Sequence, residues 1–366
     1  MDNNSEQVHY HSYLQLDQIL SAQKPRSEEL LIKPAHDETL FIIIHQVYEL
    51  WFKQIIHELK AIMAMFTEGN IDERNIGIAV AHLDRIIEIQ KLLIQQVRVL
   101  ETMSSLDFLE FRNLLFPASG FQSFQFRLVE VLLGLKESDR ITYGKTHYQD
   151  FFTDEQKREL NDIEEGGSLF ECVAQWLDRT PFLNLKGFNF LEQYRHAVHE
   201  MFNEQRETIV KDPLMPYQEK EQRLDMILGS ESFFYQLLDE QEYQKLLDDG
   251  VMKLSYNAVM ASLLINLYQD EPILHMPYNL LDRLLQIDEL FTTWRYRHAQ
   301  MTKGMLGKKP GTGGSSGHDY LRSTADHHHV FKDFHNITTL LIPRSALPEL
   351  PKSIRKELGY YYTQKH

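Results

Sequence analysis

The chain has 366 residues, 43% of them hydrophobic, which is enough to bury a sizeable core in one large domain or two ordinary ones. Its formal net charge is −15 at pH 7 and no block rich in lysine and arginine occurs, so we expect no nucleic acid partner and favour a small or neutral ligand. The single cysteine, Cys172, excludes an intramolecular disulfide, a zinc site built from several cysteines and covalent haem attachment.

The first residues, 1–33, form an arm that precedes the first long helix. Its start is polar and lacks the apolar centre of a secretory signal, and no run of eighteen apolar residues occurs in the chain. These features predict a cytoplasmic protein without a membrane partner. The arm also carries Tyr10, Tyr13 and Leu20, so we expect another surface, such as a second subunit, to cover it.

Two long helices are predicted next, over residues 40–66 and 76–101, because apolar side chains recur there at helical spacing. In the first of them Phe41 and His45 are four residues apart and therefore share a face. An aromatic wall and an imidazole would then point into one cavity. The alternative is a core histidine whose hydrogen bonds are satisfied by a neighbour.

The segment LDFLEFRNLLFPASGFQS repeats this spacing with Phe108 and Arg112. A guanidinium among so many apolar residues needs an anionic partner, which is either a ligand carboxylate or an internal Asp or Glu. Ser119 and Gly120 follow at a break before the next helix. Exposed N–H groups and the Ser119 hydroxyl could receive an anionic group there, and helix capping by Ser119 is the simpler alternative.

The rest of the chain also has helical periodicity, and period-two alternation with β-branched residues is scarce, so we predict an all-α fold in a single domain spanning residues 1–366. Residues 148–250 are rich in Glu, Asp, Gln and Lys and predict a peripheral helical insertion. The further predicted helices cover residues 120–135, 154–161, 169–177, 191–210, 255–268, 277–307 and 330–341.

The helix over residues 277–307 carries WRYRH, which ends in His298. A neutral imidazole is the commonest metal ligand, and one histidine on one side of an open site is how proximal haem ligation works. The loop KKPGTGGSSGHDY follows. It lacks the Gly-Lys-Ser/Thr ending of a phosphate-binding loop, so the choice is between a flexible linker and a lid whose Thr312 binds a ligand.

Two remaining features carry no predicted chemistry. Three consecutive histidines, 327–329, cannot converge from one helical face, and a solvated surface cluster is the favoured interpretation. Cys172 has no local catalytic signature and is expected to be a packed residue.

Several long segments in one order resemble the tryptophan 2,3-dioxygenase family over nearly the whole chain. They are YLQLDQIL, HDETLFIIIHQVYELWFKQI, LDFLEFRNLLFPASGFQSFQFRLVE, WRYRH, GTGGSSGHDYLRST and LIPR. The resemblance implies an all-α haem-binding bundle of the tryptophan/indoleamine dioxygenase type. It also implies a homotetramer, a dimer of dimers, that uses ferrous haem b and O2 to cleave the indole C2–C3 bond of L-tryptophan and give N-formylkynurenine.

The resemblance also implies a role for each matched residue. His298 is the proximal ligand of the haem iron, and His45 is the catalytic distal histidine near the indole N–H. Ser119 lies at the haem edge and near the substrate, with Gly120 beside it. The remaining matches contact the substrate, with Tyr13 supplied by a neighbouring subunit: Phe41, Phe108, Arg112, Thr312 and Tyr13.

Two other functions stay open on the sequence. One is a haem-dependent oxygenase of another aromatic amino acid on the same scaffold. The other is a haem-binding protein without catalytic activity, in which Arg112 would pair internally.

Overall fold

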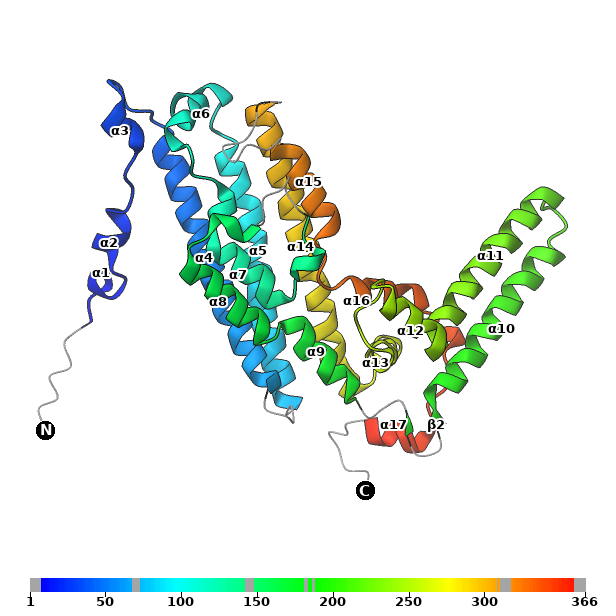
Figure 1. Ribbon diagram of the computed structural model, residues 1–366. Coiled ribbons are helices and arrows are strands. Elements are labelled where there is room, and N and C mark those ends of the chain that lie inside the picture. Colours follow the sequence, from blue (N-terminus) through cyan, green and yellow to red (C-terminus); the bar gives the residue numbers. More distant parts are fainter. Residues whose placement is uncertain are drawn as a thin grey trace, which may run out of the picture.

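The computed structural model describes residues 8–67, 73–141, 148–180, 184–185, 188–307, 309 and 317–358. Within these ranges the protein is almost entirely helical (Figure 1), and the strands are one antiparallel pair, β1 (Asn184–Leu185) and β2 (Phe188–Asn189). The predicted all-α fold is confirmed. The α-helices are α1 (Tyr10–Tyr13), α2 (Leu16–Leu20), α3 (Arg26–Leu30), α4 (Glu38–Thr67), α5 (Glu73–Leu100), α6 (Ser105–Arg112), α7 (Phe124–Leu133), α8 (Asp154–Glu165), α9 (Leu169–Asp178), α10 (Phe190–Lys211), α11 (Tyr217–Leu238), α12 (Glu240–Asp248), α13 (Tyr256–Leu267), α14 (Pro272–Leu306), α15 (Gly317–His327), α16 (Lys332–Ile337) and α17 (Lys352–Leu358).

The centre of the molecule is a bundle of long helices, in which α14 packs along α5 and α15, and α4 packs against α5 and α7 (Figure 1). The helix α4 contains no glycine or proline, and its apolar residues lie on one broad stripe. Ile55, Leu59 and Ile62 on that stripe are completely buried. Burial of such stripes, more than local helix propensity, stabilises helices of this length.

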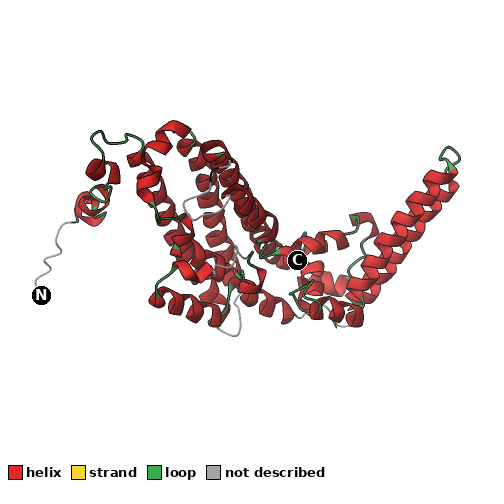
Figure 2. Ribbon diagram, turned by 45° about the horizontal axis from the view of Figure 1, so that its top comes forward, coloured by secondary structure: helices red, strands yellow, loops and turns green. Residues whose placement is uncertain are grey.

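Residues 148–250 do not form one separate unit. The helices α8 and α9 pack against the bundle through α7, α4 and α13, and Leu160, Val173 and Leu177 belong to the main core. In contrast, α10 and α11 form a hairpin that extends away from the bundle in both views (Figures 1 and 2). The average composition of residues 148–250 is polar, so it did not indicate that α8 and α9 each have an apolar face that packs against the bundle.

The N-terminal arm lies on the opposite side of the bundle from this hairpin (Figure 2). Its docked part is held by Glu38, whose carboxylate oxygens accept hydrogen bonds from the backbone N–H groups of Arg26 and Ser27, each at 2.8 Å. The part that carries α1 and α2 is exposed, and Tyr10 and Tyr13 are 76% and 74% accessible. The apolar side chains of this part therefore find no cover within the described chain.

No helix in the described ranges combines the length and the hydrophobicity needed to cross a bilayer. Cys172 is half-buried on α9, and burial raises the pKa of its thiol. This environment agrees with the packed residue expected from the sequence.

Candidate active site

A cavity of about 300 Å³ lies between α4, α6, α7, α14 and α15. Most of its wall is apolar, as is usual for a site that takes an organic ligand. It brings together seven of the residues predicted from the sequence, from four segments of the chain between residues 41 and 298: Phe41, His45, Phe108, Arg112, Ser119, Gly120 and His298.

His298 lies in the second half of α14, with Trp294 one turn earlier and 5.4 Å from it between ring centroids. Burial, and to a smaller extent the charge of His45, lowers the pKa of His298 to about 4. The imidazole is therefore neutral at physiological pH and keeps a lone pair for a metal. Its buried Nδ1 has no hydrogen-bond partner among the described residues.

His45 is on α4, where its Nδ1 donates a hydrogen bond to the carbonyl oxygen of Phe41 at 2.7 Å. A carbonyl can only accept, so this bond fixes the proton on Nδ1 and leaves Nε2 as an acceptor. The ring remains accessible through the cavity although protein surrounds its other sides. This enclosure lowers the pKa of His45, against smaller raising effects of the Phe41 hydrogen bond and the charge of Glu49.

The aromatic wall beside His45 consists of Phe41 and Phe108, and the fully buried Phe111 packs behind them. The ring of Phe41 lies 5.7 Å from that of Phe108 and 5.6 Å from that of Phe111, between centroids. Phe108 and Phe111 come from α6, whose first turn is fixed by a capping box between Ser104 and Asp107. The wall is an apolar surface suited to a planar aromatic ligand.

Arg112 is the last residue of α6 and lines the cavity on the same side as this wall. Its guanidinium is half-buried and can reach a carboxylate inside the cavity. Ser119 and Gly120 begin the short helix η2 (Gly120–Gln122). The Ser119 hydroxyl accepts a hydrogen bond from the backbone N–H of Phe121 at 3.4 Å, so Ser119 caps this turn and also lines the cavity.

Two predicted site residues are not part of the cavity that the structure describes. Thr312 lies outside the described residues. Tyr13 is on α1, exposed and distant from the cavity of its own chain, as Figure 1 shows for the helix. Tyr13 therefore does not line the cavity of its own chain in the described structure.

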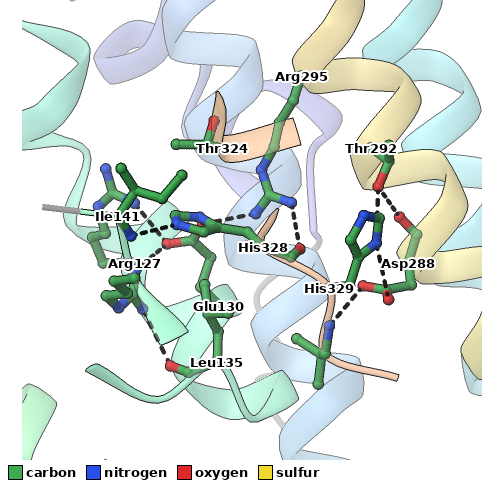
Figure 3. Close-up of polar contacts among 12 residues, drawn as sticks. Arg127, Glu130, Leu135, Ile141, Asp288, Thr292, Arg295, Thr324, His328 and His329 are labelled. Atoms are coloured by element: carbon green, nitrogen blue, oxygen red, sulfur yellow. Dashed lines mark hydrogen bonds and ion pairs between the residues drawn. The ribbon is translucent and has the colours of Figure 1, made fainter. Parts of the chain in front are cut away.

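The sequence interpretation missed a buried polar cluster that also lines the cavity (Figure 3). Glu130 of α7 accepts hydrogen bonds from Arg127, Arg140 and Arg295. Burial alone would raise the pKa of Glu130, but the charges of these arginines, Arg127 first, hold it well below its usual range. The signal that could have revealed the cluster is the Arg127/Glu130 pair, spaced three apart in an otherwise apolar helix.

The favoured interpretation of the histidine run as a solvated cluster is wrong for two of its members. His328 is buried, and its Nε2 accepts a hydrogen bond from the backbone N–H of Ile141 at 3.1 Å. His329 is half-buried with its Nδ1 3.6 Å from the carboxylate of Asp288. His327 is exposed. The run ends α15 and enters the core, which its composition does not reveal.

Comparison with known proteins agrees with this site. The family model described as tryptophan 2,3-dioxygenase matches residues 1–341. The chain belongs to the tryptophan 2,3-dioxygenase family. Similar curated proteins with that name come from Bdellovibrio bacteriovorus (48% identity, covering 97% of this chain and 99% of that protein), Dictyostelium discoideum (44%; 97% and 89%) and Mus musculus (43%; 98% and 87%).

The residues of the cavity fit the haem that this family uses. The described residues contain no group of three or more His, Cys, Asp or Glu side chains placed to hold a metal ion by themselves. A porphyrin supplies four ligands of its own and needs one protein ligand on one side. His298 fits this requirement. Its imidazole is neutral and lines the cavity, and its Nδ1 makes no hydrogen bond with the described residues.

Proposed function

We propose that this enzyme is a haem-dependent dioxygenase that cleaves the indole C2–C3 bond of L-tryptophan with O2 and releases N-formylkynurenine. The observation that carries the proposal is one cavity, in a chain of this family, that joins His298, His45 and Arg112 to an aromatic wall. Neither an oxygenase of another amino acid nor a haem protein without activity is favoured by the family and its named relatives.

The substrate is a zwitterion with an aromatic ring, and the cavity offers a group for each part of it. Arg112 binds the carboxylate through a charge-assisted hydrogen bond. Phe41 and Phe108 hold the indole ring in an apolar space. We assign the contact with the ammonium group of the substrate to Thr312, and this assignment rests only on the match of Thr312 to the family.

His45 orients the indole through its ring nitrogen. Because Nδ1 donates to the Phe41 carbonyl, Nε2 is free to accept the indole N–H. Reaction at C2 and C3 does not require the indole nitrogen to lose its proton, so His45 acts by holding that proton in a hydrogen bond. Correct placement of the two reactants is the main contribution of these side chains to the rate.

His298 would hold haem b from the proximal side, with Ser119 and Gly120 at the edge of the group. When bound, the ferrous haem supplies the centre that activates O2, and both oxygen atoms enter the product. The apolar wall formed by Phe41 and Phe108, with Phe111 packed behind it, excludes water from the side of the cavity that takes the indole.

We also propose a homotetramer, arranged as a dimer of dimers, in which Tyr13 of one subunit completes the site of another. The exposed apolar arm supports this arrangement, since Tyr10, Tyr13 and Leu20 have no cover within the described chain. A cytoplasmic location stays a prediction from the sequence.

The test is an absorption spectrum of the purified ferrous protein with and without L-tryptophan, followed by product analysis after aerobic turnover. We expect a Soret band that shifts on tryptophan addition and N-formylkynurenine as the product. The His298→Ala variant should lose the Soret band, with His275→Ala on the same helix as control. Retention of full haem and activity by His298→Ala would overturn the proximal assignment, and a different product from L-tryptophan would overturn the reaction.

A further inference from the structure

The polar cluster around Glu130 contains three guanidinium groups and one carboxylate. Arg127 and Arg140 each donate to Oε2 of Glu130 at 2.6 Å, and Arg295 donates to Oε1 at 2.8 Å. Figure 3 shows Arg127 and Glu130 of α7 and Arg295 of α14 converging, and Arg140 comes from the segment after α7. The cluster therefore ties three separate parts of the chain to one acceptor.

The positive charge of the cluster exceeds its negative charge, and little of the cluster is exposed to bulk water. The side chains of Arg127, Arg295 and Glu130 are only 9%, 6% and 4% accessible. Burial holds the nearby His328 imidazole neutral, because it lowers the pKa. Among the described residues of the cavity wall the other carboxylate is Glu49, which accepts hydrogen bonds from Ser123 and Gln125. A buried excess of positive charge is costly unless an anion accompanies it.

Arg127 has donors to offer such an anion. Its Nη1 bonds to Glu130, and no described residue accepts a hydrogen bond from its Nε or Nη2. The side chain nevertheless lines the cavity. A guanidinium has five N–H donors in a planar fork, so one edge can bind Glu130 while another binds a ligand carboxylate.

The cluster and the start of α6, the helix that ends in Arg112, contact α14 on either side of His298. On α14, Arg295 precedes His298 by three residues and bonds to Glu130. The helix α6, which ends in Arg112, meets α14 beyond His298, where the Ser105 hydroxyl donates to the Gly304 carbonyl at 3.2 Å. The two contact points on α14 are about 13 Å apart along the helix axis. Arg112 and Arg127 thus enter the same cavity from two different helices, α6 and α7.

We infer that Arg127, oriented by Glu130 and supported by the charge of Arg295, binds a propionate carboxylate of the haem. The inference rests on the proposed function, because it needs the haem at His298. Haem b carries two carboxylates, and a desolvated guanidinium is their strongest protein partner. Glu130 is then a positioning residue that fixes the free edge of Arg127 toward the cavity.

The test compares haem with its dimethyl ester, which has the same iron and ring but no free carboxylates. Each is loaded into the wild-type apoprotein, and its dissociation rate is measured from the Soret band by transfer to excess apomyoglobin. We expect the ester to leave at least tenfold faster than haem, since a charge-assisted contact is lost. Equal rates for the two porphyrins would overturn the inference, and this comparison requires no variant.

The variant Arg127→Gln localises the effect. It should release haem faster than wild type, at a rate close to that of the ester, and it should release the ester at the wild-type rate. Arg127→Lys should recover part of the haem retention. Arg206→Gln, on the projecting hairpin, is the matched control and should behave as wild type. Far-ultraviolet circular dichroism verifies that each variant is folded.

A second measurement tests whether Arg127 binds a haem carboxylate or the substrate carboxylate. The dissociation constant of tryptophan should change little in Arg127→Gln when both proteins are fully loaded with haem. A large loss of tryptophan affinity with unchanged haem release would overturn the inference and assign Arg127 to the substrate. If neither porphyrin gives a Soret band with the wild-type protein, the proposed function itself fails.

Discussion

At the residue scale, the two histidines of the cavity are distinguished by their surroundings. His45 has its proton fixed on Nδ1 by the Phe41 carbonyl, whereas the buried Nδ1 of His298 has no partner in the described chain. Both have a lowered pKa because of burial. One ring can therefore accept a substrate hydrogen bond at Nε2 while the other offers a neutral imidazole to iron.

The lowered pKa of His45 predicts that kcat/KM falls at acidic pH. Its pKa lies below 6.5, so the ring stays neutral above that pH and becomes protonated as the pH falls through the lowered value. Protonation removes the Nε2 acceptor, and kcat/KM should therefore fall on the acidic side only. The measurement is kcat/KM from about pH 5 to 8, for wild type and His45→Phe. An acid limb that is unchanged in the variant would assign it to a group other than His45.

Arg112 predicts a change in KM. Removing its guanidinium in Arg112→Ala eliminates a charge-assisted hydrogen bond worth about 1.5–3 kcal/mol, so KM for tryptophan should rise roughly ten- to a hundredfold with a smaller change in kcat. Steady-state kinetics measure both constants. Arg297→Ala is a suitable control, since Arg297 pairs with Glu101 and does not line the cavity. An unchanged KM for Arg112→Ala would exclude the carboxylate contact.

Some of the residues that line the cavity could be predicted from the sequence. The pairs Phe41/His45 and Phe108/Arg112 are local, and helical spacing alone places each pair on one face. The cluster of Glu130, Arg295 and His328 is assembled from residues up to 198 apart in number, so no local pattern contains it. Local sequence also could not choose between capping and ligand contact for Ser119, which caps η2 and lines the cavity as well.

At the scale of elements, one carboxylate connects α7 to α14. Glu130→Ala would leave Arg127, Arg140 and Arg295 buried without their shared acceptor. Breaking a buried ion pair in this way costs about 3–5 kcal/mol, and we expect at least that loss in the free energy of unfolding. Urea denaturation measures it. Glu219→Ala, which removes an exposed pair with Arg223, should change stability by no more than about 0.5 kcal/mol, and a similar small effect at Glu130 would contradict the prediction.

Helices were predicted from the sequence where one face is strongly apolar. The expected helices over residues 40–66 and 76–101 correspond to α4 and α5 within a few residues. The helix α11 was not predicted separately, because its polar residues give no clear stripe and most of its length lies outside the bundle. The pattern at residues 255–268 did predict α13, but only the structure shows that this helix is buried on all sides.

At the scale of the whole molecule, the exposed arm predicts an effect of truncation. Deleting residues 1–20 removes α1, α2 and Tyr13 but keeps Arg26 and Ser27, whose backbone bonds to Glu38 dock the rest of the arm. We expect the truncated protein to fold, to form smaller assemblies and to lose activity. Light scattering after size-exclusion chromatography measures the assembly. An unchanged tetramer with full activity would exclude the arm from both roles.

The length of α14 has a mechanical consequence. The helix begins at Pro272, among the core helices at the base of the bundle, and His298 lies 26 residues later. That distance is about 39 Å, so a tilt of one degree at the base would displace the imidazole by about 0.7 Å. Reactive groups tolerate misplacement of only about 0.5 Å. The packing of α5 and α15 along α14 therefore sets the precision with which the imidazole of His298 is placed in the cavity.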